Sequence, residues 1–367
     1  MAVVNALHRT GFSSEQIAER TSLSRARIAE LLNGAVPSMR ELRALAAGLQ
    51  LPLSYFSAAE SERSEQLRMQ FRATAQSKEG VDHSVRKVEA FVTSALKLLP
   101  VRNFGPELAN FENIFSGADD VRFHLGYDDP FMPMFDLPQR VARQDGIVLS
   151  LLNKSRFEGV SLIEGNYLFI FVSPRFSPRM LFTLAHEIGH AVNGDFAAGE
   201  PIFDLPSAIG NIRKSKTRER LADKFASDFL LPELALAKFL RSLRRQLGIM
   251  QHEKLGDIEI LYLAIFFGLS FDAAAMRCEN LGLLPEGGAF SLSNHIKKNH
   301  GSPEKRAASL GLPKRQPIEF PRLSGLLLSK IEEALSLGDV SSGWVSENFD
   351  ISISQLLDLH RQRRSNS

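Results

Sequence analysis

The sequence predicts an α+β protein that is mainly helical and contains one small sheet. Helical periodicity, with serines before the helices and glycines or prolines after them, covers most of the 367 residues. Two short runs rich in β-branched and aromatic residues, 146–149 and 167–172, have the length and composition of strands. Two long helical patterns follow them, at 177–193 and 217–231. The sheet is therefore expected directly before a pair of long helices.

The composition excludes several classes of protein and leaves a globular one. Hydrophobic residues make up 44% and charged residues 23% of the chain, which excludes collagen-like, coiled-coil and wholly disordered sequences. At about 100 to 200 residues per domain, the length corresponds to two or three domains. The formal net charge of +2 argues against a surface that is basic throughout, but it is compatible with a local basic patch.

Cysteine content and hydropathy indicate where the protein acts. The single cysteine, Cys278, excludes an intramolecular disulfide and a cysteine-rich zinc site, so a metal site would need histidines and carboxylates. The first ten residues have no apolar run of signal-peptide length, and no stretch of about 20 apolar residues appears later. We therefore expect a cytoplasmic protein without a membrane partner.

The N-terminal segment has the pattern of a helix-turn-helix. Ser13, Ser24 and Ser38 each stand before a helical pattern, where a serine hydroxyl can accept a backbone N–H bond. Arg25 and Arg27 fall in the first turn of the second helix of the pair, the part that enters the major groove. We predict that Ser24, Arg25 and Arg27 contact DNA, with either arginine reading guanine or gripping phosphate. The alternative is a helical module used only for protein contacts.

The first of the two long helices carries an H-E-x-x-H motif, HEIGH at 186–190. Ser177 is expected to cap this helix. His186 and His190 then lie one turn apart on one face, so that both imidazoles can reach one zinc ion. Glu187, next to the first histidine, is placed to act as the general base that takes a proton from the attacking water.

A third protein ligand decides which class of zinc site the motif belongs to. The metzincin class needs glycine at 193 and histidine at 196, where this chain has Asn193 and Phe196. A glutamate from a later helix is the alternative, and Glu219 supplies it, one turn before Asp223. We predict that the two histidines and Glu219 bind Zn²⁺, and that Asp223 orients a ligating histidine through its second ring nitrogen.

A chance spacing of two helical histidines and some surface carboxylates is the other interpretation of this pattern. The caps of the first helix argue against it, as does the apolar face expected on the second, formed by Leu221, Phe225, Phe229 and Leu230. Candidates for a further group that stabilises an oxyanion are Tyr167, His83 and His124.

Two parts of the chain resemble known families. Residues 182–190 (FTLAHEIGH) and 219–227 (ERLADKFAS) resemble the ImmA/IrrE metallopeptidases, and residues 12–56 resemble an Xre/Cro-type repressor domain. Many members of the peptidase family have a further histidine where this chain has Gly194, a position that is not needed to bind zinc. The resemblance implies a five-helix Xre-type DNA-binding domain at 1–58, a linker helix at 59–103, a minimal gluzincin-like zinc peptidase domain at 104–290, and a linker with a helical C-terminal segment at 291–367.

The resemblance also implies a function. The chain would be a zinc metalloendopeptidase with Glu187 as its catalytic residue, and a transcription regulator that binds an operator. Its substrate would be a repressor protein, whose cleavage derepresses stress or mobile-element genes. The alternative is a DNA-binding repressor whose peptidase-like domain is a non-catalytic sensor or dimerisation domain. The intact base Glu187 favours the enzyme, and the oligomeric state, a homodimer included, stays open.

Overall fold

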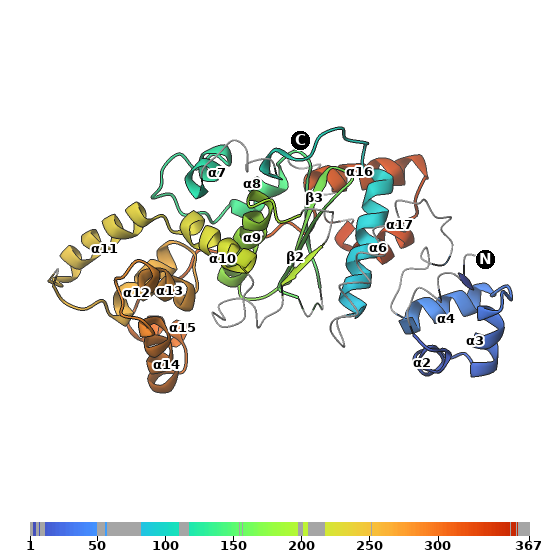
Figure 1. Cartoon of the computed structure of the whole chain (residues 1–367), viewed down its shortest axis with the longest axis horizontal. Helices are drawn as coiled ribbons and strands as arrows, with labels where there is room; N and C mark the ends of the chain where they lie inside the picture. The colour runs from blue at the N-terminus through green and yellow to red at the C-terminus, as the bar shows by residue number, and fades with distance from the viewer. Residues whose placement is uncertain are drawn as a thin grey trace. The chain divides into compact units, whose positions relative to one another are not determined.

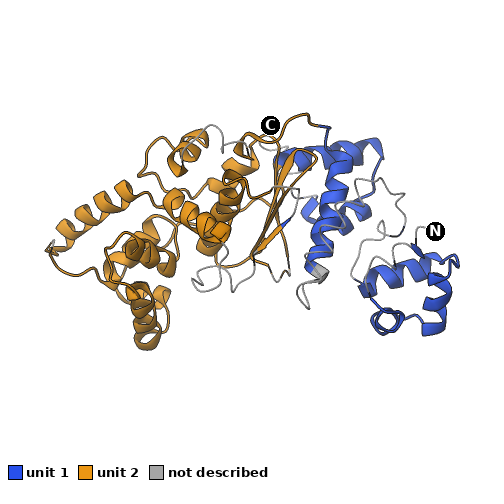
Figure 2. Cartoon of the chain, viewed as in Figure 1, with its two compact units in different colours: residues 1–101, 199–201, 325–367 blue, residues 102–198, 202–324 orange. Residues whose placement is uncertain are grey.

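The computed structural model describes residues 12–49, 82–109, 117–153, 157–196, 201–204, 217–250 and 252–352, together with positions 3, 4, 7, 56, 155, 354–356 and 358. Two compact units make up the chain: Met1–Val101, Gly199–Pro201 and Gly325–Ser367 form the first, and Arg102–Ala198 with Ile202–Ser324 form the second (Figure 2). Helices dominate, and a mixed four-stranded sheet lies in the second unit (Figure 1). The predicted α+β, mainly helical class is confirmed.

The helix-turn-helix segment of the first unit contains α2 (Ser14–Arg20), α3 (Arg25–Leu32) and α4 (Met39–Leu49). All three serines predicted as caps accept a backbone N–H bond three residues on, those of Gln16, Arg27 and Glu41. The helices bury a shared apolar core of Ile17, Ile28, Leu31, Leu45 and Leu49. The first and fifth of the five predicted helices fall largely outside the described residues.

Three further helices pack together in the first unit: α6 (Asp82–Leu98), α16 (Gly325–Leu337) and α17 (Ser342–Phe349). The rings of Phe91 and Phe349 meet edge to face at 5.0 Å. Nearby, the Ser94 hydroxyl donates a buried 2.8 Å hydrogen bond to the side chain of Asn348. The predicted linker helix is therefore packed against the predicted C-terminal helical segment.

The sheet of the second unit has the order β1-β3-β2-β4, from β1 (Ile147–Leu151), β2 (Gly159–Glu164), β3 (Tyr167–Val172) and β4 (Ile202–Asp204). β3 runs parallel to β1 and antiparallel to β2, and β4 adds antiparallel to the other side of β2. Since β3 is central, all six of its side chains are buried, which accounts for its unbroken apolar run. The two strands predicted from the sequence are β1 and β3.

β2 and β4 were not predicted. β2 is joined to β3 by a two-residue turn, Gly165-Asn166, in which both residues have positive φ. Such a turn matches the right-handed twist of an antiparallel hairpin, and it is the one local signal that could have revealed β2. β4 has only three residues, too few for any periodic pattern.

The described part of the second unit also contains nine helices: α7 (Ala118–His124), α8 (Leu137–Ala142), α9 (Ser177–Val192), α10 (Thr217–Leu230), α11 (Glu233–Leu247), α12 (Asp257–Phe266), α13 (Phe271–Asn280), α14 (Gly288–His300) and α15 (Pro303–Ser309). α9 packs on β2 and β3 with one side and on α10 with another (Figure 1). Phe225 and Phe229 of α10 are buried as predicted, but Leu221 is 49% exposed. The prediction for Leu221 was wrong because it lies on the face of α10 that carries Arg220 and Lys224.

The second unit extends past residue 290, where the sequence placed the end of the peptidase domain. Ile296 of α14 and the later Ile318 are buried in its main apolar core. Further on, the Ser324 backbone N–H donates to the carbonyl oxygen of Leu149, which covers the outer edge of β1. The predicted segment 291–367 is therefore divided between the two units at Ser324.

Among the described residues, no single helix has both the length and the hydropathy of a membrane span. The helices α12 and α13 reach both only when taken together, across a bend of 111°.

Candidate metal centre

Helix α9 carries both histidines of the motif in the interior of the second unit. It begins at Ser177 with Pro178 in its first turn, and the residue at the N-cap is Phe176, which makes no side-chain cap bond. The expectation that Ser177 caps the helix was wrong: the helix begins one residue earlier than a proline at its first position would give, so that Ser177 is its first residue and Pro178 its second. His186 and His190 are 1% and 0% exposed.

The structure brings His186, His190 and Glu219 to one point. The two Nε2 atoms lie 3.0 Å apart, and Oε2 of Glu219 lies 3.5 Å from the first and 3.6 Å from the second. Ligand atoms bound tetrahedrally at the usual zinc distances lie about 3.3 to 3.4 Å from one another. Two imidazoles and one carboxylate form the donor set of many catalytic zinc sites, so both the spacing and the chemistry of these residues fit zinc.

A carboxylate stands behind each imidazole. Nδ1 of His186 lies 2.9 Å from Oδ1 of Asp223, and Nδ1 of His190 lies 2.7 Å from Oδ2 of Asp195. A carboxylate at Nδ1 favours the tautomer whose Nε2 lone pair is free to bind a metal. Both histidines are therefore prepared to use Nε2, the atom that faces Glu219.

Sequence reasoning missed Asp195. Helix α9 ends at Val192, and Gly194 adopts a left-handed conformation, φ 70°. This turns the chain back so that the Asp195 N–H donates to the carbonyl oxygen of His190 at 3.0 Å. The available signal was a glycine followed by an aspartate directly after the motif helix.

The charges of the site favour a cation at the meeting point of the three side chains. Burial would raise the pKa of Glu219, but its interactions with His186 and His190 hold that pKa well below the ordinary value. Burial would likewise lower the pKa of His190, yet its interactions with Asp195 and Glu219 raise it to about 9. An ionised carboxylate and a strongly basic imidazole thus face the same point.

Glu187 is completely buried on the neighbouring side of α9, against strand β2. Its Oε2 accepts a hydrogen bond from the hydroxyl of Ser161. A Cβ on Gly159 would lie 1.9 Å from its Oε1, so any other residue there would force this carboxylate to move. The predicted base is therefore in contact with two residues of β2 that the sequence did not single out.

The helices that carry the ligands approach each other closely. A Cβ on Gly189 of α9 would lie 3.1 Å from Cα of Ala222 and 3.2 Å from its carbonyl oxygen. Small residues at this crossing let α10 place Glu219 within reach of both histidines.

The three candidates for oxyanion stabilisation are not brought to this point. Tyr167 lies beneath the guanidinium of Arg102, and strand alternation puts it on the opposite face of the sheet from Leu168, which is in the core that includes α9. His124 lies on α7, with Glu107 at 3.8 Å. The side chain of His83 is outside the described residues.

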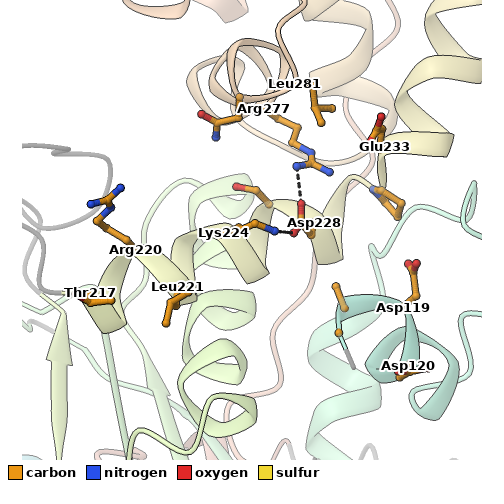
Figure 3. A pocket seen from close by; sticks show the side chains of 15 residues that line it. Asp119, Asp120, Thr217, Arg220, Leu221, Lys224, Asp228, Glu233, Arg277 and Leu281 are labelled. Atoms are coloured by element: carbon orange, nitrogen blue, oxygen red, sulfur yellow. Dashed lines mark hydrogen bonds and ion pairs between the residues drawn. The ribbon is translucent and has the colours of Figure 1, made fainter. Parts of the chain in front are cut away.

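A groove of about 1120 Å³ runs along the face of α10 opposite the ligands (Figure 3). Asp228 lies in it between Lys224 and Arg277, with 2.6 Å and 2.5 Å ion pairs. Both acidic and basic side chains line the groove, together with the exposed Leu221. The groove thus belongs to the back of the helix that supplies Glu219, and not to the metal centre.

The predicted DNA-contacting residues differ in how they are held. Arg25 is 64% exposed at the start of α3 and pairs with Glu15 at 2.8 Å. The guanidinium of Arg27 instead donates to Glu41 and Glu30, each at 2.6 Å, and to the carbonyl oxygen of Val36. The hydroxyl of Ser24 is used as the N-cap of α3. DNA contact by these residues stays a prediction, and Arg25 is the more exposed of the two arginines.

Two family models match the chain. Residues 149–279 match the IrrE N-terminal-like domain of the M78 peptidase family, and residues 9–56 match a helix-turn-helix family. No curated protein matches the chain. The chain thus carries a segment similar to a helix-turn-helix domain and a segment similar to the IrrE N-terminal-like domain, the pair that the two sequence resemblances implied.

Proposed function

We propose that this chain, with its helix-turn-helix domain and its IrrE-type peptidase domain, is a zinc-dependent endopeptidase that also binds DNA and regulates transcription. Its substrate would be a repressor protein, cleaved in the cytoplasm to derepress stress or mobile-element genes. The observation that carries the proposal is the convergence of His186, His190 and Glu219, with a carboxylate behind each imidazole.

The chemistry would be hydrolysis of a peptide bond. A zinc ion bound by this triad supplies a Lewis acid that polarises the scissile carbonyl and lowers the pKa of water. Glu187 would accept a proton from the attacking water at a carboxylate oxygen and return it to the leaving amine. Asp195 and Asp223 would keep the two imidazoles oriented throughout.

The alternative function is a DNA-binding repressor with a non-catalytic peptidase-like domain. One observation favours it: Glu187 is completely buried and bonded to Ser161, as a purely structural carboxylate would be. Under this alternative, replacing Glu187 changes neither the processing of any protein nor the response of transcription to the inducing signal.

The test is cleavage of the repressor encoded nearest to this gene, incubated with the full-length zinc-loaded protein and analysed by mass spectrometry. We expect one specific cut, which Glu187→Gln abolishes while about one zinc per chain remains bound. His186→Ala with His190→Ala should remove the zinc as well. The matched control is His295→Ala, which removes an exposed histidine of α14. A wild-type protein that holds no metal would refute the enzyme.

A further inference from the structure

Strand β2 meets helix α9 at the side chain of Glu187. Both Ser161 and Glu187 are 0% exposed, and the serine hydroxyl donates to Oε2 of the glutamate. A hydrogen bond to an ionised, buried acceptor is stronger than one between neutral groups, and losing its donor costs the full desolvation of the acceptor. The hydroxyl of Ser161 therefore helps to fix the orientation of this carboxylate.

Ser161 is well placed to fix a partner because its own backbone is held on both sides. It pairs with Ile170 of β3 on one side and with Ile202 of β4 on the other. Ile170 and Ile202 are almost completely buried. The short strand β4 covers only Gly159, Val160 and Ser161 of β2, the part of the strand that faces Glu187.

The second oxygen of the carboxylate is confined by shape. Gly159 lies two residues before Ser161, so both point to the same face of the sheet. A Cβ on Gly159 would stand 1.9 Å from Oε1 of Glu187 and 2.7 Å from Cγ2 of Thr183. Oε2 of Glu187 therefore accepts a hydrogen bond from Ser161, and Oε1 lies next to the Cα of Gly159, where any other residue would have a side chain.

We propose that Ser161 is a positioning residue that holds the carboxylate of Glu187 in the orientation needed for proton transfer. The proposal rests on the function proposed above, in which Glu187 is the base. A preorganised catalytic group needs a neighbour that locks its rotamer, and here the neighbour is a strand residue and not a loop residue. Gly159 provides the space, and Ser161 provides the bond.

The test uses a pair of variants that differ only in the hydroxyl. Thr and Val have nearly the same shape, so Ser161→Thr keeps the donor and Ser161→Val removes it. The probe is acetohydroxamic acid, titrated into the full-length protein loaded with Co²⁺ and followed by visible absorption. A hydroxamate bound to the metal shares a proton with an adjacent carboxylate. Its affinity therefore depends on the position and orientation of the Glu187 carboxylate.

We expect Ser161→Val to weaken acetohydroxamic acid about tenfold, the ordinary value of one hydrogen bond to a charged group. Ser161→Thr should stay within about threefold of the wild type, and Co²⁺ affinity should be the same in all three proteins. In the Glu187→Gln background, removing the hydroxyl should have little further effect. Ser161→Ala repeats the comparison if valine prevents folding.

Three results would overturn the proposal: equal affinities in wild type and Ser161→Val, equal losses in the Thr and Val variants, or an undiminished loss in the Glu187→Gln background. The second of these would mean that the shape of residue 161 matters and its hydroxyl does not. Failure of the proposed function looks different, because the wild-type protein would then either take up no Co²⁺ or take it up and cleave no repressor.

Discussion

Asp195 lies 2.7 Å from Nδ1 of His190, although it belongs to neither of the helices that carry the metal ligands. It is 13% exposed at its side chain, against 29% for Asp223, the corresponding partner of His186. Because Asp195 is the more buried of the two, fewer water molecules could take its place at the histidine ring if its side chain were removed. The turn after α9 is therefore part of the metal centre as much as the helix is.

Asp195→Ala is expected to weaken zinc binding by about 10- to 100-fold, the usual cost of losing the partner behind a ligating histidine. The measurement is competition for zinc against a chelator of known affinity. Asp223→Ala should cost less, because its carboxylate is more exposed. Equal zinc affinities in wild type and Asp195→Ala would mean that the contact does not orient His190.

Gly189→Ala tests the close approach of the two ligand-bearing helices. Alanine favours a helix over glycine by about 1 kcal/mol, yet its Cβ would press on the backbone of Ala222, a contact that costs about 1 to 3 kcal/mol. We expect lower zinc affinity and an unfolding free energy that does not increase. Gly343→Ala in α17 is the matched control, since its Cβ would meet nothing closer than 3.8 Å. If Gly189→Ala and Gly343→Ala raise the free energy of unfolding equally, the close approach of α9 and α10 does not limit the size of residue 189.

The sequence was sufficient for the parts whose signal is local. The three serine caps of the helix-turn-helix segment, the central strand β3 and the two motif histidines follow from spacing alone, because each depends on residues within one element or on a motif of fixed geometry. β2 was missed because Gly159 and Ser161, two of the residues on its α9 face, make room for Glu187 and interrupt the apolar pattern. Asp195 was missed because a chain reversal, and not helical spacing, sets its contact.

Arg25 and Arg27 should respond differently to the same substitution. Arg25→Ala is expected to weaken binding to a duplex from upstream of the gene and to reduce the salt dependence of binding by about one ion, with an unchanged Tm. Arg27→Ala should lower Tm, since it leaves Glu41 and Glu30 without their shared partner. Fluorescence anisotropy and differential scanning calorimetry separate the two effects. A loss of DNA affinity confined to Arg27→Ala would reverse the assignment.

The Arg27–Glu41 pair should make the stability of the helix-turn-helix domain fall in acid. The hydrogen bond from Arg27 and those from Ser38 lower the pKa of Glu41 from its usual 4.5 to about 2. A carboxyl whose pKa is lower in the folded state binds protons more readily when unfolded, so its stabilising effect is complete above about pH 4.5 and is lost as the pH falls toward 2.

The measurement is denaturant unfolding of the full chain between pH 6 and pH 3, for wild type and Glu41→Gln. We expect the wild type to be more stable at pH 6, with a difference that shrinks steadily below pH 4.5. In the Arg27→Met background the Glu41→Gln difference should be smaller and depend less on pH, because the largest cause of the lowered pKa is gone. A difference that stays constant from pH 6 to pH 3 would show that Glu41 stabilises the domain through its shape and not through its charge.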